Sequence, residues 1–178
     1  MEKVLFVFEL DHTLWNCSTG KHSQLEPPFR KEDKSLKDRS GNELYVYPEV
    51  SKVLDQIKKA NYEIVFTSTS ENPSQTLELL QLTGLDNYPF LTLFNDQPKP
   101  EQLQSIASKS GTPVANMIYF DVSRKNIEEI KPLGTTTFLI PDEGLTHDTF
   151  MVSMKNAGLL LDLDRLGITW GKKENPGS

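Results

Sequence analysis

The chain has 178 residues, enough for one domain with a substantial hydrophobic core, and it carries a net charge of −6 at pH 7. This acidic balance argues against a nucleic-acid-binding or membrane-surface protein, because such proteins hold phosphate groups with clustered cations. Cys17 is the single cysteine, which argues against an internal disulfide framework, and no apolar stretch reaches the length of a membrane span or a signal peptide. We therefore expect a protein of the cytoplasm or nucleus, without nucleic-acid or membrane partners.

Short apolar runs alternate with segments of helical spacing along most of the chain. Strands are predicted near residues 3–9, 62–67, 89–94, 116–121 and 135–140, and helices over residues 49–60, 73–85, 99–110, 123–132 and 148–166. This alternation is typical of a parallel sheet, so the sequence predicts an α/β fold with helices on both faces of the sheet. The prediction is one domain over residues 1–170 and a flexible tail over residues 171–178.

The segment over residues 16–47 interrupts this alternation. It contains Pro27-Pro28, many charged residues and Ser40-Gly41-Asn42, which indicate a long excursion with a small hairpin over residues 36–46. The strand before the segment ends in two acidic residues. The sequence therefore predicts a flap that passes over those acids.

The two acids are Glu9 and Asp11, which lie two residues apart at the end of the first predicted strand. In a phosphate-transfer site, one acid can attack phosphorus or hold a metal ion while the other moves a proton. In the simpler interpretation the carboxylates only cap the next turn, because short acid-x-acid strings are common. The residues at the ends of the later strands help to decide between a phosphate-transfer site and simple capping.

Polar side chains also follow the next three strands, at the edge where an open α/β sheet binds ligands. Thr67, Ser68 and Thr69 can donate hydrogen bonds to phosphate or cap the following helix. Lys99, between two prolines, can neutralise phosphate or be an ordinary solvated lysine. Asp121 ends the fourth strand, where it would repel the first strand's acids unless a cation lay nearby. Together these residues predict one site.

The order of these residues along the chain resembles the motif order of the haloacid dehalogenase superfamily of phosphohydrolases. More narrowly, it resembles the motifs of the magnesium-dependent phosphatase family within that superfamily. The resemblance runs from about residue 4 to residue 140. It rests on acid-x-Asp-x-Thr, then a hydroxyl residue, a lysine and an aspartate at successive strand ends. The segments that resemble the narrower family are residues 8–15, Pro27-Pro28-Phe29, Tyr47-Pro48-Glu49-Val50 and residues 120–127. The resemblance implies a Rossmann-like fold of the haloacid dehalogenase type without a large cap domain.

The resemblance also implies a role for each motif residue. Glu9 occupies the position of the nucleophile, which forms an acyl-phosphate and ligates Mg²⁺. Asp11 occupies the position of the acid and base, and its backbone carbonyl also binds the metal. Thr67 is expected to hold phosphate, Lys99 to supply a cation, and Asp121 to be a further metal ligand. The substrate-binding residues predicted in these motifs are Leu10, Thr13, Ser68, Thr69 and Lys99.

The chemistry of the residues agrees with these roles. Mg²⁺ prefers oxygen ligands and is satisfied by one or two carboxylates with water and phosphate. A carboxylate nucleophile needs cations for the phosphoryl oxygens and a nearby acid for the leaving group. The expected partner is a phosphorylated small molecule or a phosphoprotein. The resemblance implies phosphotyrosine proteins or sugar phosphates, and the residues favour neither.

Three positions depart from the family pattern. Glu9 replaces an aspartate and adds a methylene, which displaces the attacking oxygen by roughly 1.5 Å, and an error of about 1 Å can cost on the order of 10²-fold in rate. Val122 stands where the family has a second aspartate, and Ser68 where relatives carry arginine. We therefore expect a slow or specialised phosphatase. The alternative is a catalytically silent relative that binds magnesium and a phosphorylated partner.

Overall fold

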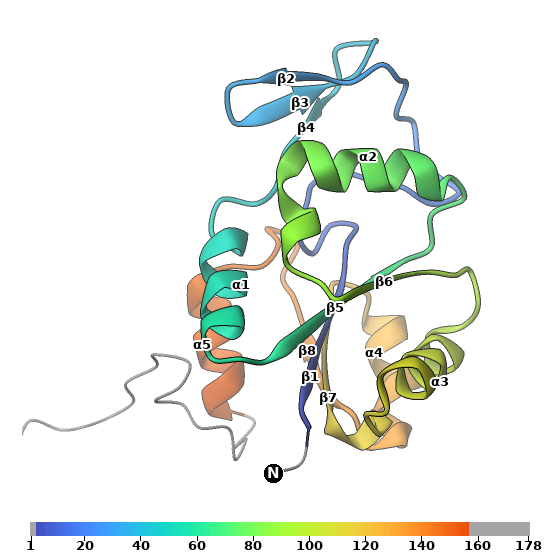
Figure 1. The fold of residues 1–178 in the computed structure, drawn as a ribbon, viewed down its shortest axis with the longest axis vertical. Coiled ribbons are helices and arrows are strands. Elements are labelled where there is room, and N and C mark those ends of the chain that lie inside the picture. Colours follow the sequence, from blue (N-terminus) through green and yellow to red (C-terminus); the bar gives the residue numbers. More distant parts are fainter. Residues whose placement is uncertain (1–2, 157–178) are drawn as a thin grey trace, which may run out of the picture.

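The computed structural model describes residues 3–156, and in this part of the chain five parallel strands form the central sheet (Figure 1). The strands, in their order across the sheet, are β6 (Leu91–Phe94), β5 (Glu63–Ser68), β1 (Leu5–Glu9), β7 (Met117–Asp121) and β8 (Thr136–Leu139). The central strand is therefore β1, with β5 and β7 as its neighbours. This order brings the carboxyl ends of the three strands that carry predicted site residues to one place.

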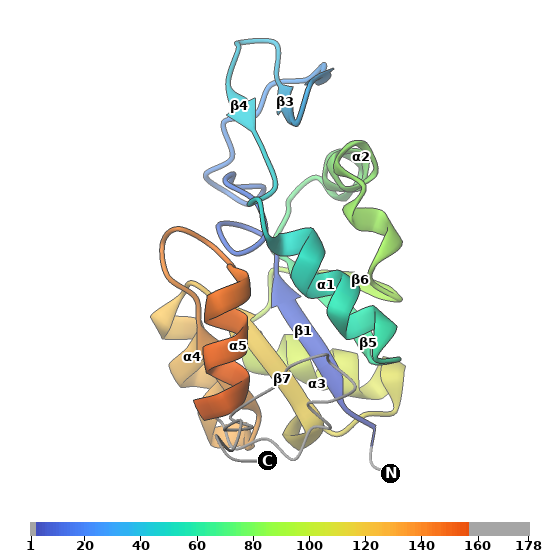
Figure 2. The same ribbon diagram turned by 90° about the vertical axis from the view of Figure 1, so that its left-hand side faces the viewer.

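Helices cover both faces of this sheet (Figure 2). They are α1 (Val50–Lys59), α2 (Pro73–Thr83), α3 (Lys99–Ser110), α4 (Arg124–Ile130) and α5 (His147–Asn156), with short 3₁₀ turns η1 (Leu85–Asn87), η2 (Val114–Asn116) and η3 (Lys131–Leu133). One apolar core includes residues of α1 and α5, and a second core includes residues of α3 and α4. The predicted α/β fold with helices on both faces is confirmed.

None of the helices between residues 3 and 156 combines the length and the apolar character needed to cross a lipid bilayer. The end of the predicted helix over residues 148–166 and the predicted tail over residues 171–178 lie outside the described residues.

The central strand is buried along its whole length, because its residues are apolar up to the acid at its end. Phe6 and Phe8 point into one core, while Leu5 and Val7 point into the other. The ring of Phe8 stacks on that of Phe120 in β7, with ring centroids 4.6 Å apart. Such packing contributes roughly 1.5–3 kcal/mol for each large buried side chain. The strand end that carries the first acid is therefore held between the two apolar cores.

The excursion after β1 forms a separate antiparallel sheet above the carboxyl edge of the main sheet (Figures 1 and 2). Its strands are β2 (Arg30–Glu32), β3 (Ser35–Lys37) and β4 (Glu43–Leu44). The predicted hairpin is present, with Leu36 paired to Leu44. Asp38 closes its turn by accepting a hydrogen bond from the Asn42 amide at 2.8 Å. The strand β2 was not predicted, because its residues are charged and carry no apolar alternation.

The base of the flap packs on the loop between β8 and α5. A Cβ atom added to Gly144 would lie 2.2 Å from Cδ2 of the Tyr47 ring, and Gly144 has a φ of +83°. The neighbouring Leu145 amide donates to the Thr13 carbonyl at 3.0 Å, and the Tyr47 amide donates to the Leu14 carbonyl at 3.0 Å. These contacts hold the chain where it leaves the central strand.

We predict that Gly144→Ala destabilises the protein much more than Gly41→Ala does. Both glycines have a positive φ, which costs about 1–2 kcal/mol for alanine, but only at Gly144 would the added methyl group overlap an aromatic ring. Displacement of that ring adds roughly 1–3 kcal/mol. Urea unfolding of the two variants measures the difference. Equal losses of stability would show that the contact between the loop and Tyr47 is unimportant.

Candidate active site

Charged and hydroxyl side chains from four segments meet at the carboxyl edge of the sheet. Glu9 ends β1, Thr67 lies in β5, Asp121 ends β7 and Lys99 begins α3. Their exposed fractions are 6% for Glu9, 0% for Thr67, 1% for Asp121 and 4% for Lys99. Charged side chains are almost never buried to this extent unless they are paired. The interpretation of Lys99 as a solvated lysine is therefore wrong.

The pairing is centred on one oxygen atom of Glu9. The Lys99 ammonium forms a buried ion pair with Oε2 of Glu9, and the Thr67 hydroxyl donates to the same oxygen at 2.8 Å. The pKa of Glu9 is raised from 4.5 to about 7, mainly because the carboxyl group is buried. The positive charge of Lys99 opposes this shift and lowers the pKa. The negative charges of Asp121 and Asp11 raise it further. The three acids therefore lie in one electrostatic neighbourhood.

Gln102 fixes the position of Lys99. The two residues are three apart in α3, so they share a face of the helix. The Gln102 side-chain oxygen accepts from Lys99 Nζ at 3.0 Å. Its amide nitrogen donates to the carbonyls of Asn95 and Gln97 at 2.9 and 2.8 Å. Sequence reasoning missed Gln102, although the spacing of three residues from the lysine was a usable signal.

Asp121 accepts hydrogen bonds from three neutral donors. The Tyr119 hydroxyl and the Asn126 side-chain amide reach Oδ2 at 2.5 and 2.8 Å, and the Ser123 backbone amide reaches Oδ1 at 2.9 Å. No donor among these three carries a charge, so they orient the carboxylate without neutralising it. Sequence reasoning missed Tyr119 because an aromatic residue inside an apolar strand is normally assigned to the core.

Asp11 lies just beyond β1, and its carboxylate is held by the chain that enters the flap. The Trp15 indole donates to Oδ1 at 3.0 Å. The Thr19 backbone amide donates to Oδ2 at 2.8 Å, and its hydroxyl donates to Oδ1 at 2.9 Å. Neither Trp15 nor Thr19 was predicted, although the spacing of Trp15 four residues after Asp11 allows such a bond within one turn.

The remaining predicted substrate-binding residues differ in their surroundings. The side chain of Leu10 is fully buried in the apolar core, which leaves only its backbone for any contact with a ligand. Thr13 is also fully buried, and its hydroxyl has no hydrogen-bond partner. The Ser68 hydroxyl accepts from the Ser70 amide at 3.1 Å. Thr69 is half-buried at the strand end. The roles of these four residues in substrate binding stay predictions.

Within residues 3–156, no group of three or more acidic, histidine or cysteine side chains is arranged to hold a metal ion. The acids are turned toward other partners: Glu9 toward Lys99 and Thr67, and Asp11 toward Trp15 and Thr19. A magnesium site does not require such a cluster, since one or two carboxylates with carbonyl and water oxygens suffice. The donor set of Glu9, the Asp11 carbonyl and Asp121 is all oxygen and fits this ion.

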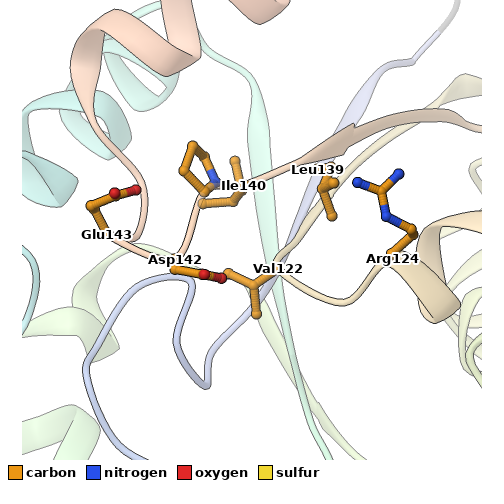
Figure 3. A pocket seen from close by; sticks show the side chains of 7 residues that line it. Val122, Arg124, Leu139, Ile140, Asp142 and Glu143 are labelled. Atoms are coloured by element: carbon orange, nitrogen blue, oxygen red, sulfur yellow. The ribbon is translucent and has the colours of Figure 1, made fainter.

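A surface hollow of about 490 Å³ opens beside the end of β7 (Figure 3). Val122, directly after Asp121, supplies an apolar wall where the family pattern has a second acid. Arg124, Asp142 and Glu143 supply the charged part of its lining. A hollow of this volume lies within the range of small-molecule sites, roughly 300–1,000 Å³.

Comparison with known proteins identifies the family. Residues 3–157 match the family described as Acid Phosphatase. The chain is 32% identical over 133 residues to Magnesium-dependent phosphatase 1 of Homo sapiens, an alignment that covers 74% of each chain. This chain belongs to the acid phosphatase family. It is also 27% identical over 142 residues to a HAD-like hydrolase superfamily protein of Schizosaccharomyces pombe, over 73% of this chain and 81% of that protein. The predicted membership of the haloacid dehalogenase superfamily, as a phosphatase, is confirmed.

Solved structures with the same fold include more distant proteins. A HAD-superfamily hydrolase of Ehrlichia chaffeensis superposes with a TM-score of 0.61 at 12% identity. The match covers 90% of the present chain and 100% of the hydrolase chain. The N-terminal part of a Bacteroides fragilis protein, which contains a phosphatase domain complexed with Mg, matches 84% of this chain and 39% of its own, with a TM-score of 0.57 at 16% identity. These likenesses confirm the predicted fold type.

The raised pKa of Glu9 predicts a pH-dependent stability. Between pH 4.5 and about pH 7, Glu9 keeps its proton in the folded protein but has released it in the unfolded chain. In metal-free buffer, Glu9 therefore makes its full contribution to the free energy of unfolding below pH 4.5. This contribution is lost as the pH rises through about 7. The full loss is about 3 kcal/mol.

Urea unfolding in chelator from pH 4 to pH 8 measures this effect, with Glu9→Gln as the control. The variant cannot titrate at this position, so its stability should lack this part of the pH dependence. A decline of the same size in both proteins would assign the effect to another group.

Proposed function

We propose that this chain is a magnesium-dependent phosphomonoester hydrolase in which Glu9 is the nucleophile. The observation that carries the proposal is the buried Glu9 carboxylate at the end of the central strand, bonded to both Lys99 and Thr67. A cation and a hydroxyl donor beside an acid are what a phosphoryl group needs during transfer to a carboxylate. The similarity to a relative named Magnesium-dependent phosphatase 1 supports the same cofactor.

Three oxygen donors are available for the metal: the Glu9 carboxylate, the Asp11 carbonyl and the Asp121 carboxylate. A Mg²⁺ held by these residues would supply positive charge to the phosphoryl oxygens and would offset the mutual repulsion of the acids, which contributes to the raised pKa of Glu9. Lys99 and Thr67 lie where they can donate both to Glu9 and to a phosphate.

In the proposed chemistry the two acids have different tasks. The Glu9 carboxylate attacks phosphorus, and the bond from phosphorus to the leaving oxygen breaks while Asp11 donates a proton to that oxygen. Asp11 then removes a proton from water, which attacks the phosphorus of the acyl-phosphate and releases inorganic phosphate and free Glu9. Trp15 and Thr19 position the Asp11 carboxylate for both proton transfers.

We place the leaving group of the substrate in the open hollow lined by Val122, the residue after Asp121, although no predicted catalytic or metal-binding residue lines this hollow. A sugar ring or the ring of a phosphotyrosine fits a volume of about 490 Å³. The apolar side chains of Val122 and Leu139 favour contact with a ring face, while Arg124 and Asp142 offer polar groups for hydrogen bonds (Figure 3). We therefore propose phosphorylated small molecules or phosphoproteins as substrates.

A second candidate function is a binding protein that holds magnesium and a phosphorylated partner without turnover. One observation favours it: Val122 offers no carboxylate beside Asp121, where the family pattern has a second acid. Activity measurements separate the two functions directly.

We predict slow, magnesium-dependent hydrolysis of an aryl phosphate by the wild-type protein and faster hydrolysis by Glu9→Asp. The shorter side chain restores the reach expected for in-line attack. Because misplacement by about 1 Å costs on the order of 10²-fold, the gain in kcat should approach that factor. Steady-state assays with magnesium or with chelator measure both effects.

The double variant Glu9→Asp, Val122→Asp is the control for the missing second aspartate at position 122. If Val122 limits the reaction, the single variant gains little and the double variant gains more. Loss of a wild-type activity in Glu9→Asp would contradict the proposed geometry. Absence of both activity and magnesium binding in all three proteins would contradict the proposed function.

A further inference from the structure

Tyr119 places a hydroxyl group beneath the metal-binding edge of the sheet. It lies two residues before Asp121 in β7, so both side chains point to the same face of the sheet. Its ring is fully buried in the core that also contains residues of α3 and α4. From there its hydroxyl donates to Oδ2 of Asp121 at 2.5 Å. A phenylalanine would fill the same core space without this bond, so the hydroxyl is not required for packing.

The hydrogen bonds of Asp121 leave a specific atom available. A carboxylate has two oxygens with about four acceptor positions in total. Oδ2 accepts from both Tyr119 and Asn126, and Oδ1 accepts from the Ser123 amide alone. Oδ2 is therefore fully used, and Oδ1 keeps one acceptor position for a further ligand.

The Tyr119 hydroxyl is a neutral donor held in a fixed position, because its ring is fully buried and its oxygen lies 2.5 Å from Oδ2 of Asp121. Because it is neutral, it orients the Asp121 carboxylate and leaves its negative charge available to a cation.

We propose that Tyr119 is a positioning residue for the magnesium ligand Asp121: it holds Oδ2 so that Oδ1 is presented to the metal. The inference rests on the proposed function, because it takes Asp121 as a ligand of Mg²⁺. Groups that hydrogen-bond a metal ligand typically change metal affinity or activity by 10–100-fold when they are removed. The hydroxyl should therefore act on the metal requirement of the protein.

Tyr119→Phe removes the hydroxyl and keeps the ring. We expect calorimetric titration with Mg²⁺ to show an affinity at least tenfold weaker than that of the wild-type protein. The Mg²⁺ concentration that gives half-maximal hydrolysis of an aryl phosphate should rise by a similar factor. Thermal unfolding in chelator checks that the fold itself is retained.

Tyr88→Phe is the matched control. It also removes a tyrosine–aspartate hydrogen bond, from the Tyr88 hydroxyl to Oδ1 of Asp55 at 2.9 Å, at a position where neither residue is a predicted site residue. Its Mg²⁺ affinity should equal that of the wild-type protein.

Each outcome bears on the inference. Unchanged Mg²⁺ affinity in Tyr119→Phe, or equal weakening in Tyr88→Phe, would overturn it and leave the proposed function intact. Failure of the wild-type protein to bind Mg²⁺ would overturn both. Should Tyr119→Phe fail to fold, the wild-type chain with 3-fluorotyrosine at its five tyrosines supplies the test. Mg²⁺ should then shift the ¹⁹F resonance of a buried tyrosine, and no shift would overturn the inference.

Discussion

Glu9 and Lys99 are buried against each other at the carboxyl edge of the sheet, where little solvent remains to stabilise either charge. The attraction within a buried pair offsets its desolvation cost only when further hydrogen bonds satisfy the remaining atoms. Thr67 supplies such a bond to Glu9, and Gln102 supplies one to Lys99. These requirements explain why polar residues are buried at the ends of strands that are otherwise apolar.

The balance of charge around this pair favours a cation. Three acids share the neighbourhood with one lysine, and the groups that bond Asp11 and Asp121 are neutral: an indole, hydroxyls and amides. The repulsion among the acids is one cause of the raised pKa of Glu9. In our account a magnesium ion relieves this repulsion, and Lys99 becomes available to a phosphoryl group. The same arrangement therefore explains the titration of Glu9 and the proposed need for a metal.

The sequence predicted those strands, helices and site residues whose positions depend on local patterns of apolar and polar residues. The apolar runs of β1 and β7 located Glu9 and Asp121, and the helical spacing over residues 99–110 predicted α3 with its observed bounds. Hydrogen bonds within irregular chain, such as that from Thr19 to Asp11 eight residues before it, depend on a loop geometry that no simple sequence pattern encodes. The charged strand β2 was missed because its pairing, and not burial of its side chains, makes it a strand.

The most direct test of the account is chemical capture of the nucleophile. The wild-type protein is mixed with magnesium and an aryl phosphate, quenched in acid and treated with borohydride, which reduces an acyl-phosphate to an alcohol. An acyl-phosphate on Glu9 gives 2-amino-5-hydroxypentanoic acid at position 9, whereas one on Asp11 gives homoserine at position 11. Our account predicts the first product by mass spectrometry of the peptide that contains both residues. Homoserine at position 11, or hydrolysis with no reduced residue, would contradict it.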